Sequence, residues 1–261
     1  MSRIQRPENT TIALFAGIAL FLAGLMVVRF GDGAAYQAVS TAFIIAMALP
    51  SYAALVRWLS WRKGLALVAL LSLIPAAVEG LAILTGIPYG HFTYSATLGY
   101  VIGGIVPWTV LFAYPPILFA AVTIASRTVR STPARILLAG AVGLAVDLVF
   151  DPAAVHAGFW AWEVPGAYYG VPLQNFIGWA VTGTCYAAIF FSAAKKETAR
   201  DGCVPVMALA GGFWTVCLWT GYLIAHGLYL PVIPGILLMG VMGWTLLRPS
   251  CPWEASGATG G

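Results

Sequence analysis

Residues 147–179 read DLVFDPAAVHAGFWAWEVPGAYYGVPLQNFIGW and connect two long apolar runs. This segment brings together three carboxylates, three Trp, two Tyr, a His and an Asn. Most of the remaining chain consists of hydrocarbon side chains. We therefore expect a bundle of lipid-embedded helices in which this polar segment carries any chemistry.

The composition excludes an ordinary soluble domain. Hydrophobic residues make up 61% of the 261 residues and charged residues only 8%, whereas soluble domains are about 25% charged. A helix that crosses a bilayer needs about 20 mostly apolar residues. The sequence thus predicts an all-α polytopic membrane protein with about eight transmembrane helices. The corresponding runs are 11–29, 36–56, 65–86, 98–126, 133–150, 173–194, 204–225 and 229–247.

The basic residues predict how these helices are oriented. Twelve of the thirteen Lys and Arg residues fall on one side if the eight runs alternate in direction, and only Arg29 falls on the other. Lys and Arg are retained on the cytoplasmic side of a membrane. We therefore expect both termini in the cytoplasm, a cytoplasmic (inner) membrane location and a candidate site toward the outer half. This bias accounts for the net charge of +4 without a nucleic-acid surface.

The domain organisation follows from the same pattern. No long soluble segment or convincing repeat interrupts the apolar runs. We expect residues 1–248 to form a single transmembrane helical domain, and the glycine-rich end 249–261 to be a disordered tail.

The four cysteines show no CxxC or other metal-ligand spacing, and most lie in or beside apolar runs. Such cysteines behave as small packing residues. We expect that role for Cys185, Cys203, Cys217 and Cys251.

Besides Asp32 in a glycine-flanked turn, four carboxylates lie in the outer half or on the outer side of this topology. Glu79 follows IPAAV within the third run, Asp147 and Asp151 share a helix face through their i, i+4 spacing, and Glu163 lies in the outer connection. An ionisable group inside a membrane is costly, which favours a functional role. The alternatives are a hydrogen bond that holds helices together, a cap or turn at Asp151 before Pro152, and a solvated Glu163.

No Lys or Arg is expected near these acids except Arg29, so desolvation and mutual repulsion favour the protonated form of at least one of them. Aromatic rings nearby attract cations through their faces, although part of the set would form an interfacial belt. An acid, water and aromatic walls match the protonation of an alkene through a carbocation. The aromatic candidates are Tyr89, Tyr94, Trp108, Trp160, Trp162, Tyr168, Tyr169 and Trp179.

Metal and nucleotide chemistry find less support. The three histidines, His91, His156 and His226, lie on the outer side but form no recognised local ligand pair. Asp147 and Asp151 resemble one Asp-rich motif of intramembrane prenyltransferases, but the second motif and the outer basic residues are missing. The sequence contains no phosphate-binding loop or dinucleotide fingerprint. We expect no metal and no cofactor.

Several spaced motifs between about residues 75 and 179 resemble one family, the membrane carotenoid hydratases, which include the CruF-type carotenoid 1,2-hydratases and the bisanhydrobacterioruberin hydratases. The flanking helices agree with that family only in hydrophobicity. The motifs are Glu79-Gly80, Pro88-Tyr89-Gly90-x-Phe92-x-Tyr94, Asp147 to Asp151-Pro152, Trp160-x-Trp162-Glu163, Tyr168-Tyr169-Gly170-Val171-Pro172, Asn175 and Gly178-Trp179.

The resemblance implies addition of water across the terminal C1=C2 bond of an acyclic ψ end, which gives a tertiary alcohol. It does not separate lycopene, γ-carotene and C50 carotenoids as substrates. Besides the carotenoid, we expect water and the bilayer as partners, together with other enzymes of carotenoid synthesis.

For the mechanism, we expect Asp147 or Glu79 to protonate C2, and Asp151 with Asn175 to orient the attacking water. Glu163 is a further catalytic candidate. The aromatic residues would surround the cation at C1.

Three alternatives remain open at the level of sequence. A membrane terpene or carotenoid cyclase would use the same acid and aromatic cage but exclude water. A proton-coupled transporter would also place carboxylates in helices, although it should show inverted repeats or broken helices. A structural scaffold would retain its role when the carboxylates are replaced by amides.

Overall fold

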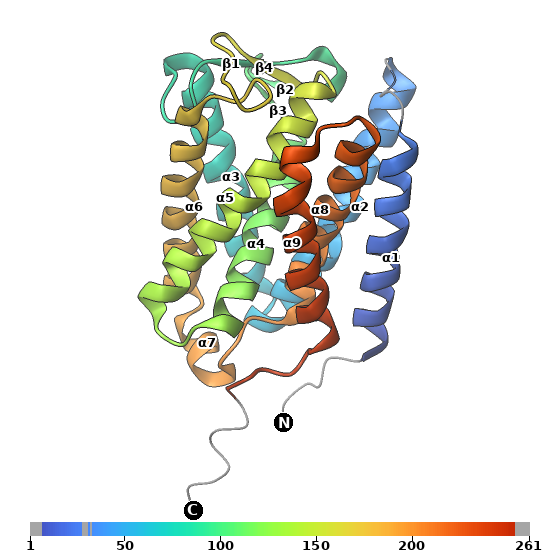
Figure 1. Ribbon diagram of the computed structural model, residues 1–261. Helices are drawn as coiled ribbons and strands as arrows, with labels where there is room; N and C mark the ends of the chain where they lie inside the picture. The colour runs from blue at the N-terminus through green and yellow to red at the C-terminus, as the bar shows by residue number, and fades with distance from the viewer. Residues whose placement is uncertain (1–6, 28–30, 32, 254–261) are drawn as a thin grey trace, which may run out of the picture.

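The computed structural model describes residues 7–27, 31 and 33–253. Within this part, eight helices are long and apolar enough to cross a membrane, and Figure 1 shows them side by side in one bundle. The predicted all-α membrane fold is thereby confirmed. The helices are α1 (Pro7–Met26), α2 (Ala34–Leu59), α3 (Trp61–Thr85), α4 (Val110–Thr128), α5 (Thr132–His156), α6 (Leu173–Ala193), α8 (Ala210–Ala225, after the 3-10 turn η2, Val206–Leu209) and α9 (Tyr229–Leu247).

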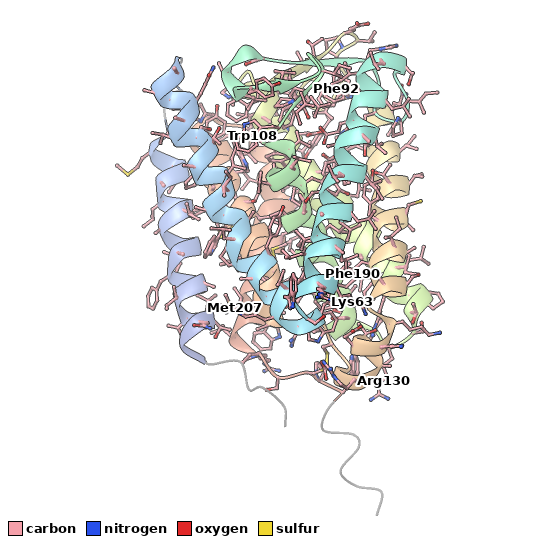
Figure 2. The ribbon with its side chains drawn as sticks, turned by 180° about the vertical axis from the view of Figure 1, so that it is seen from behind. Lys63, Phe92, Trp108, Arg130, Phe190 and Met207 are labelled. Carbon is pink, nitrogen blue, oxygen red and sulfur yellow. A yellow bond between two sulfur atoms is a disulfide. The ribbon has the colours of Figure 1, made fainter. Side chains whose placement is uncertain are left out.

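Short elements distinguish the two ends of the bundle. We call one end the strand end, because it carries β1 (Phe92–Tyr94), η1 (Ala96–Leu98), β2 (Val101–Ile102), β3 (Val106–Pro107) and β4 (Trp160–Trp162). The opposite end, the basic end, carries the short helix α7 (Lys195–Asp201), and Figure 2 shows Lys63 and Arg130 there.

Two helix boundaries near the candidate site differ from the sequence prediction. The run 98–126 becomes α-helical only at Val110, because Gly99 before β2, and Gly103 and Gly104 in the β2–β3 turn, adopt positive φ angles. Glycine reaches this left-handed region without steric cost. The run 133–150 instead continues as a helix to His156.

The continuation of α5 through Pro152 has a specific cause. A proline inside a helix cannot donate a hydrogen bond to the carbonyl four residues earlier, which here belongs to Leu148. The Tyr168 hydroxyl donates to that Leu148 oxygen at 3.0 Å. A freed carbonyl is therefore satisfied by a side chain, as a helix in lipid requires, and Asp151 stays helical.

Small residues let α1 and α8 pack closely. A Cβ atom at Gly24 would lie 2.1 Å from the Leu218 carbonyl oxygen, and one at Gly221 would lie 2.2 Å from the Phe21 oxygen. Backbones approach this closely only at glycine, which is a common way to join helices in lipid.

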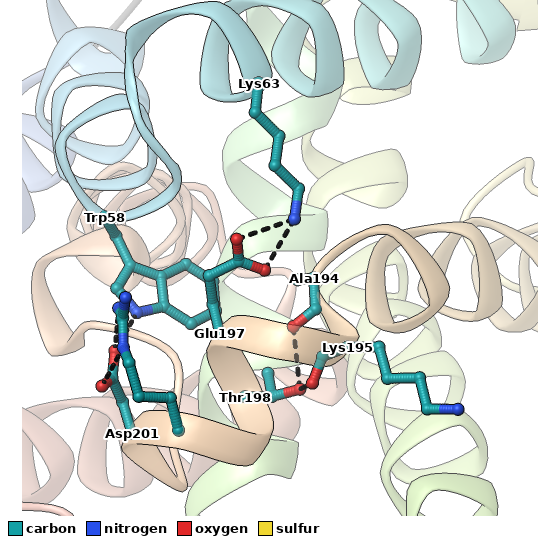
Figure 3. A network of polar contacts seen from close by, with 8 residues as sticks. Trp58, Lys63, Ala194, Lys195, Glu197, Thr198 and Asp201 are labelled. Carbon is teal, nitrogen blue, oxygen red and sulfur yellow. Dashed lines mark hydrogen bonds and ion pairs between the residues drawn. The ribbon is translucent and has the colours of Figure 1, made fainter.

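Polar contacts tie α7 to α2 and α3 at the basic end (Figure 3). Lys63 Nζ lies 2.7 Å from Glu197 Oε2, and Trp58 Nε1 donates to Asp201 Oδ2 at 2.7 Å. These contacts fix the connection between α6 and α8 beneath the bundle.

The structure corrects the prediction for two cysteines. Cys203 and Cys251 form a disulfide across 48 residues, whereas Cys217 is a buried free thiol and Cys185 an exposed one. The sequence analysis missed this pair because the two cysteines are far apart in the sequence and become neighbours only when the chain folds.

The predicted tail is also ordered at its start. Arg127 donates to the carbonyl oxygens of Pro249 and Ser250 at 3.1 and 3.0 Å, and Trp253 Nε1 donates to the Ser126 oxygen at 2.9 Å. Residues 249–253 therefore pack on the basic end, while 254–261 lie outside the described residues.

Candidate functional site

A two-stranded sheet closes the strand end above the candidate site. Strand β1 pairs antiparallel with β4, which places Phe92 opposite Trp162 and Tyr94 opposite Trp160. Alternate residues of a strand face opposite sides, so these four rings share the inner face. The Trp162 indole fastens the sheet by donating to the Tyr89 carbonyl oxygen at 2.8 Å.

A cavity of about 170 Å³ lies beneath this sheet and between the helices. Its wall is largely aromatic and aliphatic. Five of the eight predicted substrate-binding aromatic residues line it, namely Tyr89, Tyr94, Trp160, Trp162 and Trp179.

Asp147, Asp151 and Asn175 form the polar centre of the site. The Asn175 side-chain nitrogen donates to Asp151 Oδ2 at 2.6 Å and to Asp147 Oδ2 at 3.0 Å. An amide nitrogen carries two hydrogens, so it serves both carboxyls at once. All three side chains are almost completely buried, with exposed fractions of 0%, 4% and 2%.

The two aspartates occupy different places relative to the cavity. Asp151 and Asn175 line its wall, whereas Asp147 lies outside the lining set. Asp147 Oδ1 is buried, and none of the described residues hydrogen-bonds to it. The geometry thus favours Asp151 for direct contact with a ligand. Asp147 acts on Asp151 from behind, through the shared Asn175 donor and through the direct hydrogen bond between the two carboxyl groups.

Glu79 lines the cavity from α3. The Tyr94 hydroxyl donates a hydrogen bond to Glu79 Oε2, which ties a strand residue to a helix carboxylate. Burial, and then the charge of Glu79, raise the pKa of Tyr94 well above its ordinary value. The Tyr94 hydroxyl consequently remains a donor at neutral pH.

Tyr89 is fixed against α6. Its hydroxyl lies 2.9 Å from Thr182 Oγ1, and its ring packs where a Cβ at Gly178 would approach Cδ1 to 2.6 Å. The absence of a side chain at Gly178 therefore makes room for the Tyr89 ring on the cavity wall.

Besides Asp147, four predicted site residues are not brought to the cavity wall. Trp108 packs on Phe112 with ring centroids 5.8 Å apart, and Tyr168 supports α5 through Leu148. The Tyr169 hydroxyl accepts from the Leu230 backbone nitrogen at 3.4 Å. Glu163 has an exposed side chain at the strand end.

Sequence reasoning missed several aromatic residues of the wall because they lie inside uniformly apolar runs. Phe150 lies between Trp160 and Trp219, with centroid distances of 5.4 and 5.7 Å. Tyr114 packs on Trp179 at 5.1 Å. One available signal was position: Phe150 directly precedes Asp151, and Tyr114 precedes two prolines in α4.

The electrostatic setting of the cavity is acidic and lacks cations among its described lining residues, which include no Lys, Arg or His. Arg29, the one outer cation of the sequence prediction, lies outside the described residues. A carboxyl pair in such surroundings has no basic side chain on the cavity wall to form an ion pair with. The protonated form of one carboxyl is therefore favoured, and the pair is suited to donating a proton.

The histidines stand apart from this acidic centre. His156 and His226 lie with ring centroids 4.9 Å apart, and His91 is exposed, with Nδ1 3.3 Å from the Ile83 oxygen. In the part of the chain that the structure covers, no three His, Cys, Asp or Glu residues are grouped so that they could hold a metal ion.

Comparisons with known proteins point in one direction. A family model described as carotenoid biosynthesis protein matches residues 35–242, which include Glu79, Asp147, Asp151 and Asn175. A bisanhydrobacterioruberin hydratase of Haloarcula japonica is 35% identical over 206 residues, which cover 76% of this chain and 69% of that protein. No solved structure matches the chain.

Proposed function

Because this chain belongs to the carotenoid biosynthesis protein family, we propose that it is a carotenoid hydratase. It adds water to the terminal C1=C2 bond of an acyclic ψ end and forms a tertiary alcohol. The observation that carries this proposal is the Asp151 carboxyl on the wall of an aromatic cavity, hydrogen-bonded to the same Asn175 nitrogen as Asp147.

Asp151 is the proton donor in this proposal. Two carboxyls on one nitrogen atom repel each other when both are ionised, so the pair retains a proton. Asp151 transfers that proton to C2, where the π electrons of C1=C2 form the new C–H bond and leave a cation at C1. The Asn175 hydrogen bond stabilises the carboxylate left on Asp151. Asp147, which the sequence analysis named with Glu79 as a possible donor, acts as a positioning residue behind it.

Glu79 is the base. Its carboxylate accepts from Tyr94, which orients one oxygen and leaves the other for water. The water oxygen bonds to C1 and its proton passes to Glu79. The proton gained by Glu79 balances the proton spent by Asp151, and exchange with bulk water restores both groups. The net reaction consumes one water molecule and needs no cofactor.

The aromatic wall lowers the energy of the cation. Trp160 and Trp219 contact Phe150 from two sides, and all three rings line the cavity. A cation over a ring face gains about 0.5–2 kcal/mol, and only the cationic intermediate benefits. This is differential stabilisation of the reaction path.

The membrane setting follows the basic residues. We assign the basic end to the cytoplasmic side of the inner membrane, so that the strand end and the cavity lie toward the outer half of the bilayer. Water then reaches the site from the strand end, while the polyene remains in lipid.

The test is expression in a host that makes lycopene and γ-carotene, followed by chromatography and mass spectrometry of the pigments. Wild type should give products heavier by one water molecule, and Asp151→Asn should not. A matched control is Asp201→Asn, at the basic end beside Trp58, which should retain hydration. Products of unchanged mass but altered retention would point to a cyclase instead.

A further inference from the structure

Helices α2 and α3 form an angle that opens toward the strand end. They meet at the basic end, where a Cβ at Gly64 would lie 2.5 Å from Val56 Cα. Figure 2 shows them joined near Lys63 and spreading apart toward the end that carries Phe92 and Trp108.

The cavity extends into this angle. Its wall includes Ser40, Phe43, Ile44 and Met47 from the outer half of α2 and Phe112 from the start of α4. Phe43 lines the cavity, and the residue is nevertheless 39% exposed. A residue that is both wall and surface marks where the cavity reaches the lipid-facing side.

The strand end offers a different boundary. The β1–β4 sheet covers the cavity there. The Trp162 indole is hydrogen-bonded to the Tyr89 carbonyl oxygen, and the Ser95 backbone nitrogen extends the sheet by donating to the Phe159 oxygen at 2.8 Å. Water can pass such a cover, but a long rigid polyene needs a wider path. The apolar side of the cavity is the one that adjoins lipid.

The cavity volume limits how much substrate it holds. Its 170 Å³ is close to the roughly 150 Å³ of an apolar cavity that binds benzene. One branched chain end fits into such a space, and the rest of a carotenoid does not.

We propose that the carotenoid enters the cavity end first from the bilayer, through a lateral opening between α2 and α4. We call this opening the portal and define it by Phe43, Ile44, Met47 and Phe112. The remaining polyene stays outside, in the lipid beside α2. This proposal rests on the proposed function and adds the route and binding mode of its substrate.

The first experiment compares two substrates in purified membranes. One is a C40 carotenoid with an acyclic end, and the other is a C10 alkene that carries the same trisubstituted terminal double bond. The variants are Met47→Trp and Phe43→Trp, with Leu49→Trp as matched control, because Leu49 is on the same helix, 54% exposed and not part of the wall.

The portal variants should lower kcat/KM for the carotenoid about tenfold or more, since overpacking a fitted passage is costly, and change the C10 rate much less. Leu49→Trp should leave both rates near wild type. Equal loss for both substrates, or carotenoid rates like those of Leu49→Trp, would overturn the portal. A wild type that hydrates neither substrate would instead contradict the proposed function.

A binding measurement tests the portal without turnover. In an Asp151→Asn background, the carotenoid that co-purifies per protein should fall at least severalfold with Met47→Trp and stay unchanged with Leu49→Trp. Equal amounts in the two variants, at equal yields of monodisperse protein, would refute lateral entry whether or not the protein is a hydratase.

Discussion

The side-chain nitrogen of Asn175 lies 2.6 Å from Asp151 Oδ2, although the two residues are 24 positions apart on different helices. The same nitrogen donates a hydrogen bond to Asp147 Oδ2, so one amide joins two buried carboxyls beside the cavity. Helix α5 supplies the acids and α6 supplies the donor that orients them. We propose that catalysis depends on this junction.

Replacing Asn175 by Ala should therefore impair both stability and turnover. The substitution removes both hydrogen bonds and leaves two buried carboxyls without their donor, at a cost of about 1–3 kcal/mol for each group left unsatisfied. We expect a lower thermal unfolding temperature in detergent and at least about a tenfold loss of hydration.

The control for Asn175 is Gln174→Ala, which removes the 2.7 Å hydrogen bond from Gln174 to the Gly86 oxygen at the same end of α6. It should affect stability but largely spare the rate per folded protein. Full hydration activity in Asn175→Ala would contradict the role of the shared donor.

Tyr94→Phe should lower kcat by about ten- to a hundredfold, because Glu79 loses the hydroxyl that orients it. The pKa of Tyr94 is raised well above its ordinary value, so the hydroxyl stays protonated as pH rises from 5 to 9. Loss of the Tyr94 proton thus contributes nothing to the pH profile in that window. Tyr94→Phe should therefore be slower than wild type at every pH from 5 to 9, and the shape of its pH–rate profile should match that of wild type.

The exposed Tyr100 provides the control for Tyr94, and Tyr100→Phe should behave as wild type. If Tyr94→Phe alone abolished a fall in rate between pH 5 and 9, the assignment of Tyr94 as a constant donor would be wrong.

Trp160→Leu should slow hydration through loss of a ring face beside the cation, whereas Trp160→Phe should retain part of the rate. The expected loss is about 2- to 30-fold, equivalent to about 0.5–2 kcal/mol. Initial rates with saturating carotenoid measure it. Trp108→Leu is the comparison, because Trp108 packs outside the wall, and a larger effect there would contradict the assignment of the cage.

Tyr168→Phe should act on the fold more than on the chemistry. It leaves the Leu148 carbonyl, freed by Pro152, without the Tyr168 donor, and an unsatisfied buried carbonyl costs about 1–3 kcal/mol. Thermal unfolding should show the loss, while kcat/KM per folded protein should change little. A selective rise in KM without loss of stability would restore Tyr168 as a substrate-binding residue.

Much of the fold was predictable because lipid imposes strict requirements on sequence. The lengths of the apolar runs gave the eight helices. The hairpin before Val110 was missed since its residues are as apolar as a helix, and glycine conformation decided the outcome. The Cys203–Cys251 pair joins segments whose proximity no local spacing reveals.

The candidate site was predictable in Glu79, Asp147 and Asp151 and only partly in its aromatic residues, whereas the fourth predicted acid, Glu163, is exposed at the strand end. Buried carboxylates stand out in an apolar chain, and the i, i+4 spacing placed Asp147 and Asp151 together. Which of the two faces the cavity depends on the rotation of α5 against α6, and the sequence does not fix that rotation. Trp219 lies in α8, which is far from Asp151 in the sequence, and it could not be told apart from the other apolar residues of that run.

The most direct test of the central claim is hydration in water enriched in oxygen-18 by membranes that contain wild type, Asp151→Asn or Asp147→Asn. The wild-type product should carry one labelled oxygen, Asp151→Asn should give no product, and Asp147→Asn should give reduced but measurable product. Labelled product at the wild-type rate from a folded Asp151→Asn variant would contradict the claim that this carboxyl protonates the substrate.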